Sequence, residues 1–472
     1  MGRRRKKKIY QEIEITGIAD KGKAVGRTEE GEVIFVKGVV PGDKVDILRT
    51  KKRSKYMEGR VIGFHEYSSD RVEPFCEHFN ACGGCDWQSM AYDTQLKHKH
   101  SVVENAIKRL GKIEPEEFLP IVGCDETKFY RNKMEFSFSC KRWLTPEEIN
   151  DESISNREDV LGFHPKGAFD KIIDIKKCWL QPDPSNDIRL ASKEVAKDMG
   201  LTFFDAYANE GFMRNMVVRL SSLGELMLIY AFYENKEEEI KQFLDTMQER
   251  FPQISSLFYV INPKKNDFLL DLDFVLYKGK DHIVEQLGDV QFKIGPKSFF
   301  QTNSRQAKVL YDKVVEFAGL DGTQNVYDLY TGVGSIALYV SKFAKKVVGV
   351  EEIPTAIEDA KVNMAMNGIE NCTFYAGDVK NILTDAFADE HGKPDLVITD
   401  PPRAGMHQDV VDMFLKLESP RIVYVSCNPA TQARDIQLLS EKYELKKLQA
   451  VDMFPNTHHI ESVAMLELKE QK

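Results

Sequence analysis

The pattern of apolar and polar positions divides the chain into parts of different character. From 12 to 64, short runs of alternating apolar and polar residues are separated by turn residues, which is typical of half-buried strands. Residues 91–113 have the spacing of an amphipathic helix, and from 128 to 290 strand-like runs predominate. Beyond 290, apolar runs of strand length alternate with helical periodicity, which predicts an α/β sheet.

The first part predicts a small five-stranded barrel of the OB type, a common nucleic-acid binder. The chain carries a net charge of −9, but residues 1–60 hold 17 Lys and Arg against 9 Asp and Glu, a local excess of +8. The blocks RRRKKK and KKRSK suit contacts with phosphates, although RRRKKK alone could be a solvated tail. Barrel and basic flanks together favour RNA as a partner.

Three closely spaced cysteines indicate a metal or cluster site. Cys76, Cys82 and Cys85 are spaced C-x5-C-x2-C with two glycines between the last two. The eight cysteines are irregularly spaced, which favours metal binding or catalysis over a disulfide framework. Zinc and a cubane iron–sulfur cluster both require four ligands. Cys178, between a strand-like run and a proline, is the best candidate for the fourth.

The C-terminal part contains a pattern of nucleotide-cofactor binding. A predicted strand ends at Asp328, and a GVG turn opens a helix at Ser335. The next predicted strands end at Glu351 and Asp378. A glycine turn followed about 20 residues later by an acidic strand end is the arrangement that binds a ribose. The third glycine of GxGxxG is missing, so the pattern fits S-adenosylmethionine (SAM) better than NAD.

Two further apolar runs, 396–399 and 422–425, are followed by reactive side chains. Asp400 comes directly after the first run, and Cys427 lies two residues beyond the second. Ligands bind at the carboxyl ends of strands in open α/β sheets, so we expect both residues over one crevice. Cysteine is intrinsically nucleophilic, although many intracellular cysteines are only small core residues.

Taken together, these motifs resemble the uracil-C5 RNA methyltransferase family, in particular its iron–sulfur branch that includes 23S ribosomal RNA enzymes. The N-terminal segment is similar to a TRAM domain. The resemblance covers nearly the whole chain and includes, in the family's order, the Cys triplet with a distant Cys, YRNK, FFQTN, DLYTGVG, VGVE, DPPRAG, VSCNPAT and DMFPNTHHIE. It implies SAM-dependent methylation of carbon 5 of a uridine, in 23S rRNA or, as the alternative, in the thymine loop of tRNA.

The resemblance also implies roles for individual residues. Cys427 matches the nucleophile that adds to carbon 6 of uracil, and Glu461 matches the base that removes the carbon-5 proton. The expected SAM contacts are Gln301, Tyr330, Ser335, Glu351, Asp378 and Asp400. The expected RNA contacts are Asp400, Arg403, Arg131 and Lys133. The cysteines Cys76, Cys82, Cys85 and Cys178 would hold a [4Fe–4S] cluster.

Some positions depart from the family pattern, and two other classes of protein stay open. Thr331 stands where many relatives have Cys, and Ser335 where many have Asn. An acidic stretch, 146–159, is expected to point away from RNA. The alternatives are an amino-methyltransferase and a non-catalytic RNA-binding or assembly protein. Cys427 counts against both; Arg403 after the proline pair counts against the first, and Glu461 against the second.

We therefore expect a multidomain protein with three parts. They are an OB-like barrel of the TRAM type (1–64), a central α+β domain with the cluster (65–290) and a Rossmann-like SAM methyltransferase domain (291–472). Helix 91–113 could pack on the last of these. No apolar run reaches the roughly 18 residues that a membrane span needs, and there is no signal-peptide pattern. The expected location is the cytoplasm, and the expected state is a monomer without a membrane partner.

Overall fold

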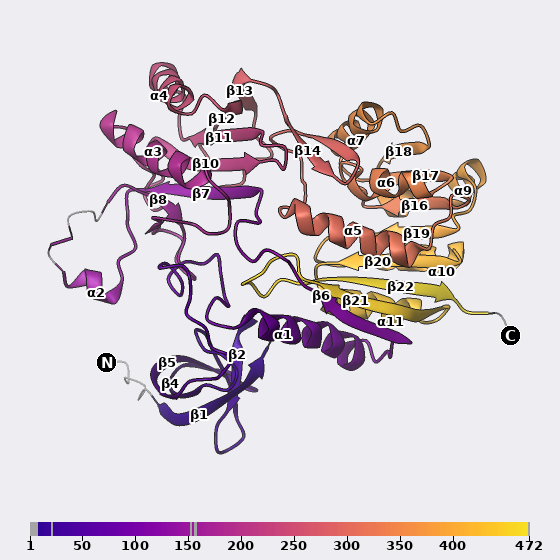
Figure 1. Cartoon of the computed structure of the whole chain (residues 1–472), viewed down its shortest axis with the longest axis horizontal. Helices are drawn as coiled ribbons and strands as arrows, with labels where there is room; N and C mark the ends of the chain where they lie inside the picture. Colours follow the sequence, from indigo (N-terminus) through magenta and orange to yellow (C-terminus); the bar gives the residue numbers. More distant parts are fainter. Residues whose placement is uncertain (1–7, 20–21, 152, 155–157, 471–472) are drawn as a thin grey trace.

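The structure is a computed structural model that describes residues 8–19, 22–151, 153–154 and 158–470 (Figure 1). Of the RRRKKK block, only Lys8 lies within these residues. Part of the acidic stretch 146–159 also lies outside them; its described part includes the short helix α2 (Pro146–Ile149). Among the described residues, no helix has both the length and the apolar character that crossing a membrane requires.

The N-terminal part forms the predicted five-stranded barrel. Its strands are β1 (Ile9–Ile18), β2 (Ala24–Arg27), β3 (Val33–Val36), β4 (Lys44–Lys52) and β5 (Met57–Glu66). They close in the order β1-β2-β3-β5-β4, with β3 and β5 parallel. Alternate apolar side chains, among them Ile15, Ile34 and Ile47, are fully buried inside it. The alternation in the sequence therefore marks the inner face of the barrel.

A seven-stranded sheet forms the middle of the molecule. Its strands are β7 (Lys133–Ser139), β8 (Val160–Phe163), β9 (Ile173–Asp174), β10 (Met213–Leu220), β11 (Leu226–Phe232), β12 (Ile254–Ile261) and β13 (Phe274–Gly279). The order is β13-β12-β11-β10-β7-β8-β9. Helices α3 (Ser185–Asp198) and α4 (Glu237–Arg250) lie together on the outer face of this sheet (Figure 1). Strands β10 and β11 are buried almost throughout, which explains the continuous apolar run of β11.

The C-terminal part is an eight-stranded sheet in the order β18-β17-β16-β19-β20-β22-β21-β6. Its strands are β6 (Glu117–Val122), β16 (Asn325–Leu329), β17 (Lys346–Glu351), β18 (Cys372–Ala376), β19 (Leu396–Thr399), β20 (Arg421–Ser426), β21 (Tyr443–Val451) and β22 (Glu461–Leu468). The neighbouring strands β18, β17, β16, β19 and β20 run parallel to one another. Strand β22 is antiparallel to both of its neighbours, β20 and β21. The strands expected at 396–399 and 422–425 are β19 and β20.

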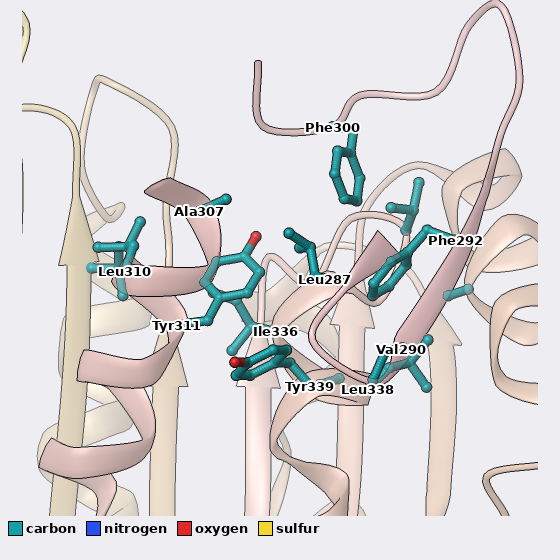
Figure 2. Packing of buried hydrophobic residues seen from close by; sticks show 14 of the residues in the cluster. Leu287, Val290, Phe292, Phe300, Ala307, Leu310, Tyr311, Ile336, Leu338 and Tyr339 are labelled. Atoms are coloured by element: carbon teal, nitrogen blue, oxygen red, sulfur yellow. The ribbon is translucent and has the colours of Figure 1, made fainter. Parts of the chain in front are cut away.

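Helices cover both faces of this sheet (Figure 1). They are α5 (Ser304–Ala318), α6 (Ser335–Val340), α7 (Pro354–Met366), α8 (Val379–Ile382), α9 (Asp385–His391), α10 (Gln408–Leu417) and α11 (Pro429–Leu439). A hairpin of β14 (Ile283–Leu287) and β15 (Val290–Ile294) packs against α5 and α6. Figure 2 shows this contact, in which Tyr311 and Tyr339 lie with ring centroids 5.6 Å apart beside Leu287 and Ile336.

Two elements from the first third of the sequence belong to this C-terminal assembly. The helix expected at 91–113 is an α-helix, α1 (Tyr92–Asn105), that continues as a π-helical stretch, Ala106–Leu110. It packs against β21 and α11, and strand β6 pairs in parallel with β21 at the edge of the sheet. The early part of the chain is therefore tied directly to the sheet that carries the strand-end residues.

Candidate active site

Two of the predicted reactive residues lie at the carboxyl ends of neighbouring parallel strands. Asp400 follows β19, Cys427 follows β20, and the two strands pair from Leu396 with Arg421 to Thr399 with Tyr424. Asn428 fixes the second loop to the first, because its side-chain amide donates to the Arg403 carbonyl oxygen at 2.9 Å. The expectation that Asp400 and Cys427 share one edge of the sheet agrees with this arrangement.

The antiparallel strand β22 brings Glu461 to the same edge. Ser426, the last residue of β20, pairs with Ser462 of β22. One step further along this register, Cys427 stands opposite Glu461, the first residue of β22. Because opposite residues of an antiparallel pair lie roughly 5 Å apart at Cα, the thiol and the carboxyl group are neighbours. A candidate nucleophile and a candidate base therefore come together from positions 34 residues apart in the sequence.

Burial raises the pKa values of the acidic groups of this site. It raises the pKa of Cys427 to about 11, and the charges of Glu461 and Asp400 add to the effect. Burial, and then the Asp400 charge, raises the pKa of Glu461 well above its usual value. The pKa of Asp400 rises to about 7, through burial first and then the charge of Asp328. Ionisation of any one of these groups is therefore disfavoured while its neighbours are charged.

Arg403 opposes the rise in pKa at Cys427 and Glu461. Its guanidinium group hydrogen-bonds to the Cys427 thiol and lowers the pKa of that thiol, and it also lowers the pKa of the Glu461 carboxyl. The side chain thus interacts with the candidate nucleophile Cys427 and the candidate base Glu461. A cation beside a thiol favours the thiolate, which is the reactive form of cysteine.

The residues expected to hold SAM follow four adjacent strands. Tyr330, Glu351, Asp378 and Asp400 come after, or end, β16, β17, β18 and β19, which are neighbours in the sheet. The Glu351 carboxylate accepts a hydrogen bond from the backbone N–H of Gly332 at 3.1 Å, which connects the end of β17 to the glycine turn. Gly332 has a φ of +57°, and a Cβ atom there would meet nothing within 4 Å. The turn thus faces open space beside carboxylates, which suits a nucleoside cofactor.

The remaining expected SAM contacts are positioned by side-chain hydrogen bonds. Ser335, the first residue of α6, has its hydroxyl 3.0 Å from the Tyr311 hydroxyl. The Gln301 carbonyl oxygen accepts from the Asn132 side chain at 2.9 Å. Thr331, where many relatives have Cys, donates its hydroxyl to the Asp328 carboxylate at 2.5 Å. Thr331 and Ser335, the two residues that depart from the family pattern, therefore both have hydrogen-bond partners within the protein.

The two expected RNA contacts from the YRNK segment lie in different surroundings. The Arg131 guanidinium lies 5.8 Å from the ring centroid of Phe454, seven residues before Glu461. Lys133 instead lines a small cavity together with Arg219 and Glu285. Burial lowers the pKa of Lys133. Arg131 is thus directed toward the segment that leads to Glu461, and Lys133 toward the interior.

The four predicted cluster ligands line a single cavity. Cys76, Cys82 and Cys85 come from the loop before α1, and Cys178 comes from the loop after β9. The other lining residues are largely apolar or aromatic and include Phe79, Phe163, Ile175, Trp179 and Leu180. Within the described ranges, no three His, Cys, Asp or Glu residues are arranged to hold one metal ion. In a four-iron cluster each cysteine binds a different iron, so the four sulfurs need not meet at one point. The residues fit such a cluster.

Sequence reasoning missed the polar contacts around residues 452–460, which precede Glu461. Lys99 and Asp452 form an ion pair at 2.6 Å whose two side chains are completely buried. Asp86 and His458 form a second pair at 2.7 Å. Their partners lie more than 350 residues apart, so only the isolated residue types were visible in the sequence.

Known proteins are similar to the chain over most of its length. Residues 185–469 match the family tRNA (Uracil-5-)-methyltransferase, and residues 4–62 match the TRAM domain. A Bacteroides thetaiotaomicron protein described as an RNA methyltransferase is 52% identical over 455 residues, which cover 96% of this chain and 100% of that protein. A Chlorobaculum tepidum protein with the same description is 38% identical, covering 97% of this chain and 96% of its own.

One solved structure is similar to the whole chain. It is the Pyrococcus abyssi tRNA (uracil-54, C5)-methyltransferase in complex with S-adenosyl-L-homocysteine (SAH). The TM-score is 0.74 and the identity is 29%, and the match covers 96% of this chain and 99% of that one. The similarity thus includes the barrel, the middle sheet and the C-terminal sheet.

Proposed function

The chain belongs to the tRNA (uracil-5-)-methyltransferase family of SAM-dependent RNA methyltransferases, and from this premise we propose that it methylates carbon 5 of a uridine in 23S rRNA through a covalent Cys427–uracil adduct. The observation that carries the proposal is the β20–β22 register, which sets Cys427 opposite Glu461. A nucleophile and a base are the two protein groups that this reaction requires, because carbon 5 of uracil is a poor nucleophile until a thiolate adds to carbon 6.

In the first step, the Cys427 thiol loses its proton to solvent and the thiolate bonds to carbon 6 of the uracil. The electron pair of the 5,6 double bond moves into the ring carbonyl, which gives an enolate that is nucleophilic at carbon 5. Arg403 supports this step because its guanidinium group stabilises the thiolate. Asp400, which follows the neighbouring strand β19, would accept a hydrogen bond from the ring N–H of the uracil.

Bound SAM supplies an electrophilic methyl group, and Tyr330, Ser335, Glu351, Asp378 and Gln301 would hold it at the strand ends. After carbon 5 has taken the methyl group, the Glu461 carboxylate removes the proton from that carbon. The C–H electron pair re-forms the 5,6 double bond, and the C6–S bond breaks to release the Cys427 thiolate. The high pKa of Glu461 makes its ionised form a strong base.

The RNA must present its target base outside a helix. A crevice at the end of a sheet can receive a uracil only if the nucleotide is flipped from its stack or lies in a single-stranded loop. The TRAM barrel, with its basic residues, is suited to hold the flanking RNA. Arg131, beside Phe454, would contact the nucleotides nearest the flipped base.

The cysteine cavity is proposed to hold a [4Fe–4S] cluster through Cys76, Cys82, Cys85 and Cys178. Uracil methylation needs no oxidant or reductant, so the cluster would serve as a cross-link between the loop before α1 and the loop after β9. We expect the purified protein to contain iron and acid-labile sulfide, both lost in Cys178→Ser. Absence of iron in anaerobically prepared protein would contradict this assignment.

A second candidate substrate is tRNA. The structurally similar Pyrococcus abyssi enzyme acts on uracil 54 of tRNA, so the same chemistry could serve the thymine loop here. We favour rRNA because the four cysteines resemble those of the iron–sulfur branch of the family, which includes 23S rRNA enzymes. The active-site chemistry is the same for both substrates. The protein must therefore be tested with rRNA and with tRNA.

The experiment is nucleoside mass spectrometry after incubation of the pure protein and SAM with unmodified 23S rRNA or unmodified tRNA. We expect 5-methyluridine in the rRNA and none with Cys427→Ala, because that variant cannot form the adduct. Product in tRNA alone would retain the mechanism and overturn the choice of substrate. No 5-methyluridine in either RNA, from protein that binds SAM, would overturn the proposed reaction.

A further inference from the structure

We infer that the cysteine-bearing loop positions the catalytic base, by clamping the segment 452–460 through Asp86 and His458. Asp86 directly follows Cys85, and its carboxylate lies 2.7 Å from His458 Nδ1. The backbone N–H groups of Asp86 and Trp87 both donate to the Asn456 carbonyl oxygen, at 2.8 and 3.1 Å. We call these contacts the 86–458 clamp. This inference rests on the proposed function, in which Glu461 removes the carbon-5 proton.

The segment 452–460 needs such external support because it contains no helix or strand. Its backbone groups are held from several directions: Tyr130 donates to the Pro455 carbonyl oxygen at 2.9 Å, and Asn303 donates to that of Met453 at 2.9 Å. The side chain of Asn456, whose φ is +64°, accepts from Gln95 at 3.2 Å. The path into Glu461 is therefore set by contacts with distant parts of the chain.

Among the polar contacts that link 452–460 to distant described parts of the chain, the clamp lies nearest to the base. His458 lies three residues before Glu461, whereas the buried Lys99–Asp452 pair lies nine residues before it. On the other side, Asp86 is one residue from Cys85, and its second partner is Lys166. Lys166 also donates to the Cys85 carbonyl oxygen at 3.1 Å. Asp86 thus joins the cysteine loop, the central part of the chain and the approach to Glu461.

The barrel reaches the same histidine. A Cβ atom on Gly22 would lie 2.8 Å from His458 Cβ, so the glycine backbone packs directly on this side chain. Trp87, beside Asp86, donates its indole N–H to the Gly22 carbonyl oxygen at 3.3 Å. His458 therefore lies where the barrel, the cysteine loop and the approach to the base meet. Asp86 and His458 act through Glu461 and are positioning residues.

The clamp should affect one step of the reaction. Cys427 and Asp400 follow β20 and β19, and the loops that carry them have no contact with Asp86 among the hydrogen bonds of the described residues. Loss of the clamp should therefore leave addition of the thiolate and methyl transfer nearly intact. Removal of the carbon-5 proton should slow, because a base misplaced by about 1 Å can lose roughly a hundredfold in rate.

The test uses the full protein with substrate RNA and methyl-labelled SAM in single turnover. In His458→Leu we expect labelled RNA to remain covalently bound to the protein under denaturing conditions, with release slowed roughly tenfold to a hundredfold. His458→Asn, whose side-chain amide can donate to Asp86 from the position of Nδ1, should restore release. Lys193→Met, which removes the comparable Lys193–Asp174 pair at 2.8 Å in the central part, is the matched control and should behave as wild type.

The outcomes separate this inference from the proposed function. Release from His458→Leu at the wild-type rate would overturn the clamp, and so would an equal loss of methyl transfer and release. Iron content should match the wild type in His458→Leu, and a variant that lost iron would point to a structural role instead. If wild-type protein formed neither adduct nor 5-methyluridine, the proposed function itself would fail.

Discussion

At the residue scale, burial disfavours the ionised forms of the proposed nucleophile Cys427, the proposed base Glu461 and the neighbouring Asp400. Cys427 has a pKa of about 11 and Asp400 one of about 7, each with burial as the largest cause. Asp328, which lies at the end of β16, also has a pKa raised to about 7, chiefly by burial. A sulfonium cation would favour the ionised carboxylates, so cofactor binding and protonation should be coupled.

This coupling predicts a pH dependence that distinguishes SAM from SAH. Below about pH 7 Asp400 is protonated, and above it the carboxylate is ionised and attracts the sulfonium charge. The affinity for SAM should therefore rise relative to that for SAH between about pH 6 and about pH 8, and SAM binding should release protons. Calorimetric titrations of both ligands across this range measure the ratio.

Asp400→Asn is the matched variant for this prediction. It keeps the size of the side chain and removes the ionisation, so the rise in the SAM-to-SAH affinity ratio should become smaller. Asp328 remains and accounts for the residual change. An affinity ratio that is independent of pH in the wild-type protein would contradict the assignment of Asp400 to the cofactor crevice.

At the element scale, the closure of the barrel depends on close approach of strands β3, β4 and β5. Gly59 of β5 lies over the barrel interior, and a Cβ atom there would come 2.2 Å from Ile47 Cγ2 and 3.3 Å from Ile34 Cδ1. Both isoleucine side chains are fully buried. Gly63 of the same strand has open surroundings, because its nearest neighbours are atoms of Asp46 at 3.6 and 3.8 Å.

The two glycines give a paired prediction. Gly59→Ala should destabilise the barrel by about 1–3 kcal/mol, because the added methyl group overpacks a filled interior. Gly63→Ala should change stability by less than about 0.5 kcal/mol. Hydrogen–deuterium exchange of the β4 and β5 amides in the full chain measures the effect locally. Equal protection in both variants would show that the barrel interior accommodates the extra methyl group.

At the scale of the whole molecule, charge is distributed unevenly. The chain has a net charge of −9, although residues 1–60 alone carry 17 Lys and Arg against 9 Asp and Glu. At the end of β4 and in the turn that follows it, Lys51, Arg53 and Lys55 are exposed. An acidic body with one basic end directs a polyanion to that end, so the barrel should dominate the electrostatic part of RNA binding.

Replacing Lys51, Arg53 and Lys55 with Gln should weaken RNA binding and reduce its dependence on salt. Each lost phosphate contact lowers the slope of log K against log salt concentration by about 0.7 on single-stranded RNA, so three contacts give a change of about 2. Fluorescence anisotropy with a target RNA across a salt series measures this slope.

The matched control replaces three exposed basic residues outside the barrel. Lys197 and Lys241 lie on α3 and α4, on the outer face of the middle sheet, and Lys265 follows β12 (Figure 1). Their replacement with Gln changes the net charge equally and should leave the slope within error. If both triple variants changed the slope alike, net charge and not the barrel would govern RNA binding.

The sequence by itself determined the elements and part of the site. Alternation with period two predicted the five barrel strands, and the apolar runs predicted β19 and β20, because local periodicity reports which face of a segment is buried. The rule that ligands bind at strand ends placed Asp400 beside Cys427. The cysteine spacing predicted a shared site, and the four side chains do line one cavity.

Only the tertiary structure decided how distant segments meet. Only the family resemblance identified Glu461 as a candidate base. Its place opposite Cys427 follows from the antiparallel register of β20 and β22. The Asp86–His458 pair joins residues 372 positions apart. Such pairings are selected by the packing of whole sheets and loops and not by local propensity, so no spacing in the sequence reports them. Local pattern thus supplies the reactive groups, and long-range packing determines which of them act together.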